Sequence, residues 1–224
     1  MNLKQTILNW SLVSPQRHAL DQVLIPVLKT INAKSVADVG GGGEENYNFL
    51  FPNANYKIID IQKAPRVDIV ADIQNMKNVQ NLGFDLVIAV RLWLLLKYPD
   101  KAIFEIKRIL KNGGKAVVYL EFINYTCLAK SDIDWSRFPL TKAESYGKLF
   151  KRWKVYPIGN HHLFYFNWLW HEVMGFLTRR NWVGKRVKIK ALFFIPILFL
   201  MHLLAKMGKT NDLTPIGWLL VVGK

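Results

Sequence analysis

A run of glycines lies between two segments whose residue types suit the binding of a nucleotide-like cofactor. The β-branched segment Ser35–Val39 leads into Gly40–Gly43, and Asp60 closes the next apolar segment. Glycines allow close approach of the backbone to a ligand because they carry no Cβ. A carboxylate about 20 residues further on can accept hydrogen bonds from both ribose hydroxyls. The pattern predicts a cofactor at the carboxyl edge of a parallel sheet, and a glycine turn of purely steric origin is the alternative.

Three other side chains are candidates for a general base, which a hydroxyl acceptor would need. His161 and His162 follow the turn at Gly159, and Asp134 lies three residues before Arg137. An exposed loop is the alternative for the two histidines, and an ion pair to Arg137 is the alternative for Asp134. No set of Cys, His or carboxylate residues has the spacing of metal ligands, so the sequence predicts no metal site.

Strands and helices alternate along the first 122 residues. Apolar periodicity predicts helices over 18–31, 45–51 and 101–110, the last of them ended by a left-handed cap at Asn112-Gly113-Gly114. Apolar, β-branched runs predict strands over 35–39, 56–61, 67–71, 84–90 and 115–122. A helix over 141–150 and strands over 153–158 and 218–222 are expected further on. This alternation indicates an α/β fold with a doubly wound parallel sheet.

These motifs, in this order, resemble class I S-adenosylmethionine-dependent methyltransferases of the type 11 kind. The matching positions are Asp38–Gly43, Asp60, Asp72, Phe84–Val87 and Arg108–Gly114. A second element, Asp134-Trp135-Ser136-Arg137-Phe138, is similar to one that follows strand five in methyltransferase-like proteins of bacterial glycan clusters. The resemblance covers residues 15–122 well. It implies a Rossmann-like sheet of seven strands, the last antiparallel, with helices on both faces.

The resemblance implies S-adenosylmethionine as the cofactor and gives roles to nine residues. Asp60 would bind the ribose hydroxyls, and Asp72 the adenine amino group. The other cofactor-site residues would be Asp38, Gly40 and Gly42 in the glycine loop, Ile61 and Ile73 on the two faces of the adenine, and Val90 and Arg91 beside the sulfonium.

Two segments depart from the family's pattern. Glu44 stands where a third glycine of the loop is usual, and Arg91-Leu92-Trp93-Leu94-Leu95 replaces the usual Glu-Val-Leu-Glu-His after strand four. A histidine often found before the second element would fall at Leu128. These changes leave open a non-catalytic relative that scaffolds a membrane assembly.

Positive charge is concentrated in the C-terminal part of the chain. The net charge is +15, and residues 131–224 carry 15 Lys and Arg against 5 Asp and Glu. Nucleic acid, anionic lipid and an anionic substrate are all compatible with this charge. A nucleic-acid methyltransferase is the weakest of these interpretations, because the charge lies beside apolar stretches and no Asn/Asp-Pro-Pro-Tyr motif occurs.

Residues 191–205 are almost wholly apolar but fall short of the about 20 residues that span a bilayer. Together with the basic run Lys185–Lys190 and the aromatic residues 164–170, they resemble a helix lying in the plane of a membrane surface. A buried core helix is the alternative. The single cysteine, Cys127, excludes an intrachain disulfide and favours a reducing compartment, and the N-terminal residues do not resemble a signal peptide.

We therefore expect a methyltransferase-like Rossmann domain over residues 1–160 and 214–224, with a helical, aromatic and basic insertion over 161–213. The expected activity is methyl transfer from S-adenosylmethionine to a small molecule, a glycan or a lipid-linked sugar. The expected location is the cytoplasm or the inner face of the membrane.

Overall fold

A computed structural model describes residues 13–42, 46–123, 135–178, 196–207 and 214–224. The chain divides into two compact units. The sheet unit comprises Leu24–Phe122, Thr126–Tyr156 and Gly217–Lys224. The helical unit comprises Met1–Val23, Ile123–Tyr125 and Pro157–Ile216.

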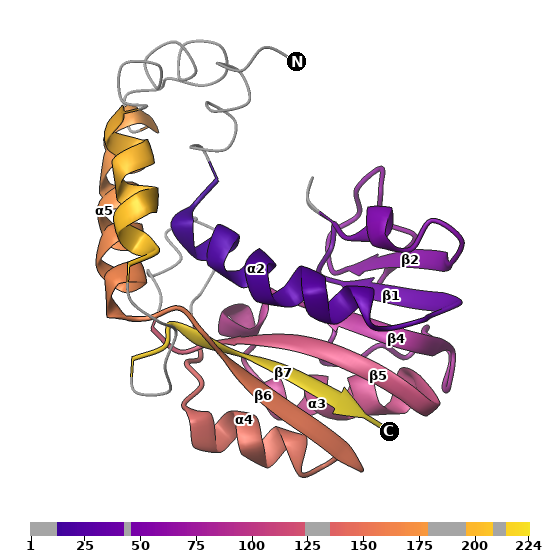
Figure 1. Ribbon diagram of the computed structural model, residues 1–224. Coiled ribbons are helices and arrows are strands. Elements are labelled where there is room, and N and C mark those ends of the chain that lie inside the picture. Colours follow the sequence, from indigo (N-terminus) through magenta and orange to yellow (C-terminus); the bar gives the residue numbers. More distant parts are fainter. Residues whose placement is uncertain (1–12, 43–45, 124–134, 179–195, 208–213) are drawn as a thin grey trace. The chain divides into compact units, whose positions relative to one another are not determined.

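The sheet has seven strands in the order β3-β2-β1-β4-β5-β7-β6 (Figure 1). Strands β1 to β5 run parallel, and β7 is antiparallel to β5. The strands are β1 Ser35–Val39, β2 Asn55–Asp60, β3 Ile69–Val70, β4 Phe84–Ala89, β5 Leu110–Glu121, β6 Arg152–Ile158 and β7 Gly217–Gly223. The order confirms the predicted α/β sheet with an antiparallel last strand.

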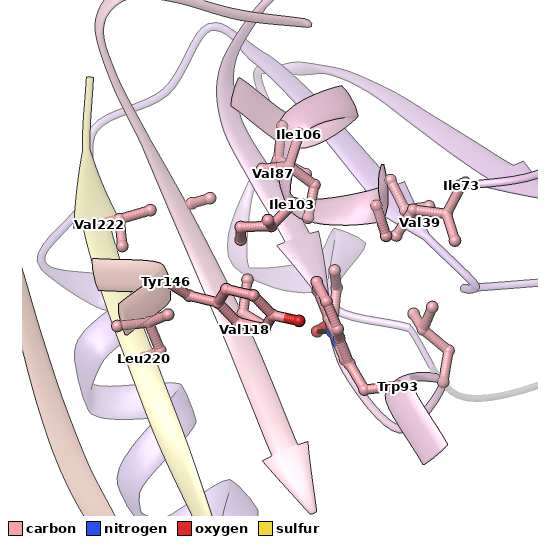
Figure 2. Close-up of a cluster of buried hydrophobic side chains, with 14 of the residues drawn as sticks. Val39, Ile73, Val87, Trp93, Ile103, Ile106, Val118, Tyr146, Leu220 and Val222 are labelled. Carbon is pink, nitrogen blue, oxygen red and sulfur yellow. Dashed lines mark hydrogen bonds between the residues drawn. The ribbon is translucent and has the colours of Figure 1, made fainter. Parts of the chain in front are cut away.

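The main hydrophobic core lies between this sheet and two helices, α3 (Pro99–Ile109) and α4 (Leu140–Gly147). Helix α3 turns Ile103 and Ile106 into the core, three residues apart and therefore on one face. The same core contains Val87 of β4 and Val118 of β5, and Trp93 packs close to Tyr146 with ring centroids 6.1 Å apart (Figure 2). Helix α2 (Pro15–Lys29) is drawn over the opposite face in Figure 1, and its buried Leu24 and Leu28 belong to the sheet unit.

The helical unit contains α5 (His161–Thr178) and a helix over residues 196–205. Trp170 of α5 packs against Leu198 and Met201 in a small separate core. His161 and His162, for which an exposed loop was the alternative, are part of helix α5. No helix among the residues that the structure describes is long and apolar enough to cross a membrane.

Two predicted elements differ from the observed ones. In place of a helix over 45–51, the described part of that segment forms one 3-10 turn, η1 (Asn48–Leu50). Asn46, Tyr47, Asn48 and Phe49 are all weak helix formers, so local preference does not support a regular helix there.

The predicted glycine cap after α3 is also wrong. Helix α3 ends at Ile109, and Leu110 already has extended backbone as it enters β5. Gly113 does adopt a positive φ of 78°, but inside the strand. There the pairing of β5 with β4 is irregular, because Phe84 pairs with Leu110 but Leu86 pairs with Lys115.

A carboxylate ties the amino ends of three strands together. Asp85, at the start of β4, accepts hydrogen bonds from the backbone N–H and hydroxyl of Ser35 at 2.9 and 2.8 Å and from Lys111 Nζ at 2.9 Å. Burial raises the pKa of Asp85, but the hydrogen bonds from Lys111 and Ser35 outweigh it and lower the pKa to about 2.

Substitution Asp85→Asn should lower the free energy of unfolding at neutral pH by about 1 kcal/mol, a usual size for a partly exposed, charge-assisted set of hydrogen bonds. A carboxylate with a lowered pKa stabilises the fold above its unfolded value of about 4 and loses that effect as the pH falls toward 2. Urea unfolding of both proteins should therefore give curves that converge between pH 4 and pH 2. A difference that stays constant down to pH 2 would contradict this.

Candidate functional site

The glycine loop follows β1 at the carboxyl edge of the sheet, and its geometry demands glycine. Gly40 has a φ of 80°, and its N–H donates to the carbonyl of Ile59 at 2.7 Å. A Cβ on Gly40 would lie 2.7 Å from Leu92 Cδ2, and one on Gly42 would lie 2.7 Å from Asp60 Oδ2. The loop is thus pressed against the ends of both neighbouring strands, and no other residue type fits without a shift.

Asp60, at the end of β2, is held in place by the backbone on both sides. Its Oδ2 accepts the N–H of Gly42 at 3.0 Å, and its Oδ1 accepts the N–H of Gln62 at 2.9 Å. A carboxylate offers about four lone-pair sites, so each oxygen can accept one further hydrogen bond. Two adjacent hydroxyls, such as those of a ribose, match this arrangement.

Asp38, at the end of β1, has a partner that the sequence analysis did not identify. It is 2% exposed, and Tyr56 Oη donates to its Oδ2 at 2.5 Å. The same phenol oxygen accepts the N–H of Tyr47 at 3.1 Å. Burial, followed by the negative charge of Asp38, raises the pKa of the Tyr56 phenol. Asp38 therefore fixes the chain that returns from the glycine loop.

A signal for this contact is present in the sequence. Tyr56 is paired in register with Val36, two residues before Asp38. Because side chains alternate along a strand, Tyr56 and Asp38 lie on the same face of neighbouring strands. A tyrosine in that position, opposite a strand that ends in an aspartate, could have been recognised once the register was known.

The predicted adenine subsite is divided between a buried and an exposed residue. Asp72 Oδ1 accepts the N–H of Gln74 at 2.8 Å, which orients the carboxylate after β3. Ile73 is 5% exposed and packs in the main core beside Val39 (Figure 2). Ile61 is 64% exposed, so it is the one of the two isoleucines with a side chain open to a ring.

The tip of β4 has an unusual backbone. Val90 is buried, and Arg91 is exposed with a φ of 61°, a conformation that costs a non-glycine residue about 1 kcal/mol or more. The following Leu92 packs under Gly40. Trp93 anchors the loop by donating from its indole N–H to the carbonyl of Ala89 at 3.0 Å.

The described part of the second element, Trp135–Phe138, is joined by backbone hydrogen bonds to the 3-10 turn η2 (Trp93–Leu95) and to the end of β5. Trp135 N–H donates to the carbonyl of Leu94 at 2.8 Å, and Phe138 N–H donates to the carbonyl of Glu121 at 2.9 Å. Glu121 itself, the last residue of β5, is buried and only 1% exposed. The segment from Trp135 to Phe138 is therefore fixed both to the segment after β4 and to the end of β5.

The three candidate bases are His161, His162 and Asp134. His161 and His162 occupy the first turn of α5 rather than a loop, with ring centroids 4.1 Å apart. Asn160 caps this helix, because its Oδ1 accepts the N–H of Leu163 at 3.1 Å. Asp134 lies outside the described residues. Within the described part of the chain, no group of three or more His, Cys, Asp or Glu residues could hold a metal ion.

Residues 38–118 match a family model described as a methyltransferase domain. The segment begins at Asp38 and includes the glycine loop, Asp60, Asp72 and the tip of β4, on a sheet whose last strand is antiparallel. Residues 38–118 therefore form a methyltransferase-type domain core. S-Adenosylmethionine is the cofactor of such domains, and the loop and the carboxylate of Asp60 fit it.

Solved structures share the fold of this methyltransferase domain at low sequence identity. Phosphoethanolamine N-methyltransferase 2 of Haemonchus contortus, in complex with S-adenosylmethionine, is 14% identical with a TM-score of 0.51; the match covers 89% of this chain and 51% of that one. The MccD protein is 11% identical with a TM-score of 0.53, over 92% and 96% of the two chains. The cyclase SpnF is 14% identical with a TM-score of 0.53, over 92% and 79%.

These similarities concern the fold alone. This chain spans about half the length of the H. contortus enzyme. No curated protein sequence matches it.

Substitution Gly42→Ala should weaken S-adenosylmethionine binding by at least about tenfold, because the new Cβ would displace Asp60 Oδ2 from its place beside the loop. Calorimetric titration of folded protein measures the effect. Gly83→Ala is the matched control, since a Cβ there lies 3.4 Å from its nearest neighbour, the carbonyl of Gln80. Equal affinities for wild type and Gly42→Ala would show that the cofactor does not occupy this edge.

Proposed function

We propose that this protein transfers a methyl group from S-adenosylmethionine to a small molecule, a glycan or a lipid-linked sugar at a membrane surface. The observation that carries the cofactor half of this proposal is the carboxylate of Asp60, oriented by two backbone N–H groups against a loop that only glycine fits. The acceptor half rests on the helical unit and on the tip of β4.

Each residue of the cofactor site has a distinct proposed task. Asp60 accepts the ribose hydroxyls, Asp72 accepts from the adenine amino group, and Ile61 covers the ring. Gly40 and Gly42 allow the backbone to approach the methionine part, while Asp38 holds the loop through Tyr56. S-Adenosylmethionine, when bound, supplies a methyl group on a positively charged sulfur.

Methyl transfer depends more on the alignment of the reactants than on side-chain chemistry. The tip of β4, at Val90 and Arg91, is the proposed place where the acceptor meets the methyl group. The strained backbone of Arg91 supports a functional role, because strain of this kind persists where the surroundings enforce it. The exposed guanidinium would suit an acceptor that carries negative charge.

A hydroxyl acceptor also needs a base, and His161, His162 and Asp134 remain the proposed candidates. The chemistry of the side chains supports the two histidines, because imidazole is the group most often used for proton transfer near neutral pH.

Apolar side chains on the surface of the helical unit support the membrane part of the proposal. On α5, Tyr165, Trp168 and Leu169 are 61%, 47% and 38% exposed. On the helix over 196–205, Leu200 and Leu203 are 52% and 48% exposed. The opposite side of the second helix is buried against Trp170, so each helix has its inner side packed and an apolar outer side.

Charge adds to this argument. Residues 179–190, which connect the two helices in the chain, contain six Lys or Arg and no Asp or Glu. Basic residues near an anionic membrane surface contribute about 1 kcal/mol each, and exposed aromatic and leucine side chains suit the boundary between headgroups and acyl chains. We therefore propose peripheral attachment at the inner face of the membrane.

A non-catalytic relative is the second candidate function. Arg91 to Leu95 replace the acidic residues and the histidine that the family usually has after strand four. The similarity to SpnF, a cyclase by its description, shows that the fold alone does not fix a reaction. In that case the sheet unit would support an assembly through its surface.

Substitution Asp60→Ala should abolish calorimetrically detectable binding of S-adenosylmethionine, because both acceptors for the ribose hydroxyls are removed. Asp100→Ala is the control and should bind as wild type does, because it removes an exposed carboxylate of α3 that pairs with Lys142 of α4. Loss of binding in Asp60→Ala alone would support the site and justify a search for the acceptor. A well-folded wild type that does not bind would favour the non-catalytic candidate.

The double substitution Leu200→Ser and Leu203→Ser should reduce binding to vesicles that contain phosphatidylglycerol by about tenfold or more, since about 50 Å² or more of apolar surface per leucine would leave the lipid. Co-sedimentation with vesicles measures it. Phe104→Ser is the control, because Phe104 is a 56% exposed apolar residue on α3 of the sheet unit. If the double variant and wild type sediment alike, this surface is not the membrane contact.

A further inference from the structure

A pocket of the sheet unit lies on the face of the sheet opposite to α3 and α4. It has a volume of about 420 Å³, and its walls come from the end of α2, the start of the paired part of β5, and strands β6 and β7. The main core on the other face contains Ala116 of β5 and Val222 of β7. Because side chains alternate along a strand, those of Lys115 and Val221 point to the side of the pocket.

Strand β6, at the edge of the sheet, supplies one wall of the pocket through the same alternation. Val155 packs against the main core, and the ring of Trp153 lies close to Gly147 of α4 on that side. Arg152 and Lys154 are the alternate residues, and both line the pocket. The edge strand therefore directs two basic side chains to the face that α3 and α4 leave uncovered.

Gly223, near the end of β7, leaves a gap between two of the basic residues. It pairs in register with Lys115 of β5. A Cβ built on Gly223 would meet a single atom within 4 Å, Cβ of Arg152 at 3.7 Å, which is an ordinary contact. Crowding therefore does not require glycine at this position. The missing side chain leaves open space between a lysine on one neighbouring strand and an arginine on the other.

The charged side chains that line the pocket, Lys115, Arg152 and Lys154, are all basic. No Asp or Glu is among the described residues that line it, and none of the three forms an ion pair with a carboxylate in that part of the chain. Asp85 lines a neighbouring hollow together with Lys115, but it is paired with Lys111 at 2.9 Å. Like charges on neighbouring strands repel each other, so an anion between them is stabilising.

The remaining walls are largely apolar. Val27 and Ile31 line the pocket from α2 and the turn after it, and Val221 lines it from β7. Tyr156 of β6 contributes a ring whose centroid lies 4.6 Å from Nζ of Lys154. Small-molecule sites have volumes of about 300 to 1,000 Å³ and combine apolar walls with a few polar groups. A ligand that satisfies both parts of this pocket has an anionic head and an apolar body.

A macromolecular occupant is less compatible with this pocket. A second copy of the chain would bring a net charge of +15 toward basic side chains. A peptide strand added to β6 would meet Lys154 and Pro157, and such residues on an edge strand oppose the pairing of a further strand. The charge and the shape together favour a small anionic amphiphile.

We propose that this pocket binds a medium-chain fatty acid, with its carboxylate above Gly223 between Lys115 and Arg152, and its acyl chain against the apolar walls. The planar guanidinium of Arg152 suits a carboxylate, to which it can donate two parallel hydrogen bonds. Lys115 lies six residues before Glu121, the carboxyl end of β5, which is about 20 Å along the strand. The pocket is thus remote from the glycine loop, and the proposal does not depend on methyl transfer.

The first test is a calorimetric titration of the full chain with decanoate, below its micelle concentration and at low salt. Saturable binding at one site is expected. Decanol, which has the same chain without the charge, and butyrate, which has the same head with a short chain, should each bind at least about tenfold more weakly. Affinity for decanol or butyrate equal to that for decanoate, or binding of decanoate that does not saturate, would overturn the proposal.

Variants place the ligand in the pocket. Arg152→Met should weaken decanoate binding by about tenfold, as the loss of one charge-assisted contact predicts. Lys63→Met, which removes an exposed lysine elsewhere in the sheet unit, is the control and should bind as wild type does. Gly223→Leu should weaken binding by about tenfold or more, because its side chain would fill the gap. Unchanged affinity in folded Gly223→Leu would contradict the site; if that variant does not fold, Arg152→Met decides.

A last variant separates this pocket from the apolar surface of the helical unit. The double substitution Leu200→Ser and Leu203→Ser changes that surface and should leave the affinity for decanoate unchanged, since neither residue lines the pocket. Loss of decanoate binding in the double variant, with normal binding in Arg152→Met, would place the ligand on the helical unit and overturn the proposal.

Discussion

The parallel pairing of β1 with β2 on one side and β4 on the other is the constraint on which the candidate site depends. Val39 is in register with Ile59 and with Ala89, so the three strands end at the same level. The glycine loop, Asp60 and Arg91 follow these ends directly. Because the loop leaves β1 between two neighbours, it must pass close to both, and this explains why glycine is required on each side.

Most of the fold was predictable because it depends on patterns that are local in the sequence. Buried parallel strands appear as continuous apolar runs, and the strands predicted over 35–39 and 84–90 lie within a residue of the observed β1 and β4. The glycine loop and Asp60 were found from their spacing alone. In the structure, the hydrogen bond from the N–H of Gly42 to Asp60 joins the loop to this carboxylate. The loop and Asp60 are the part of the site that could be predicted from the sequence.

What the sequence did not reveal depends on long-range contacts. The partner of Asp38 is a tyrosine 18 residues away, and the role of Asp85 is visible only when Ser35 and Lys111 lie beside it. The sequence Asn112-Gly113-Gly114 is typical of a helix cap, but the pairing of β5 with β4 determines the conformation of Gly113. In the same way, Asn48–Leu50 form a 3-10 turn where periodicity predicted part of a helix over 45–51. Tertiary structure outweighed local preference in each case.

The left-handed backbone of Arg91 has a consequence for the way this domain can evolve. Glycine at that position would relieve the backbone strain, and it would also remove the guanidinium of this exposed residue. Selection for stability and selection for a guanidinium at the end of β4 therefore act in opposite directions on a single codon. The residue found there reveals which of the two pressures has prevailed in this chain.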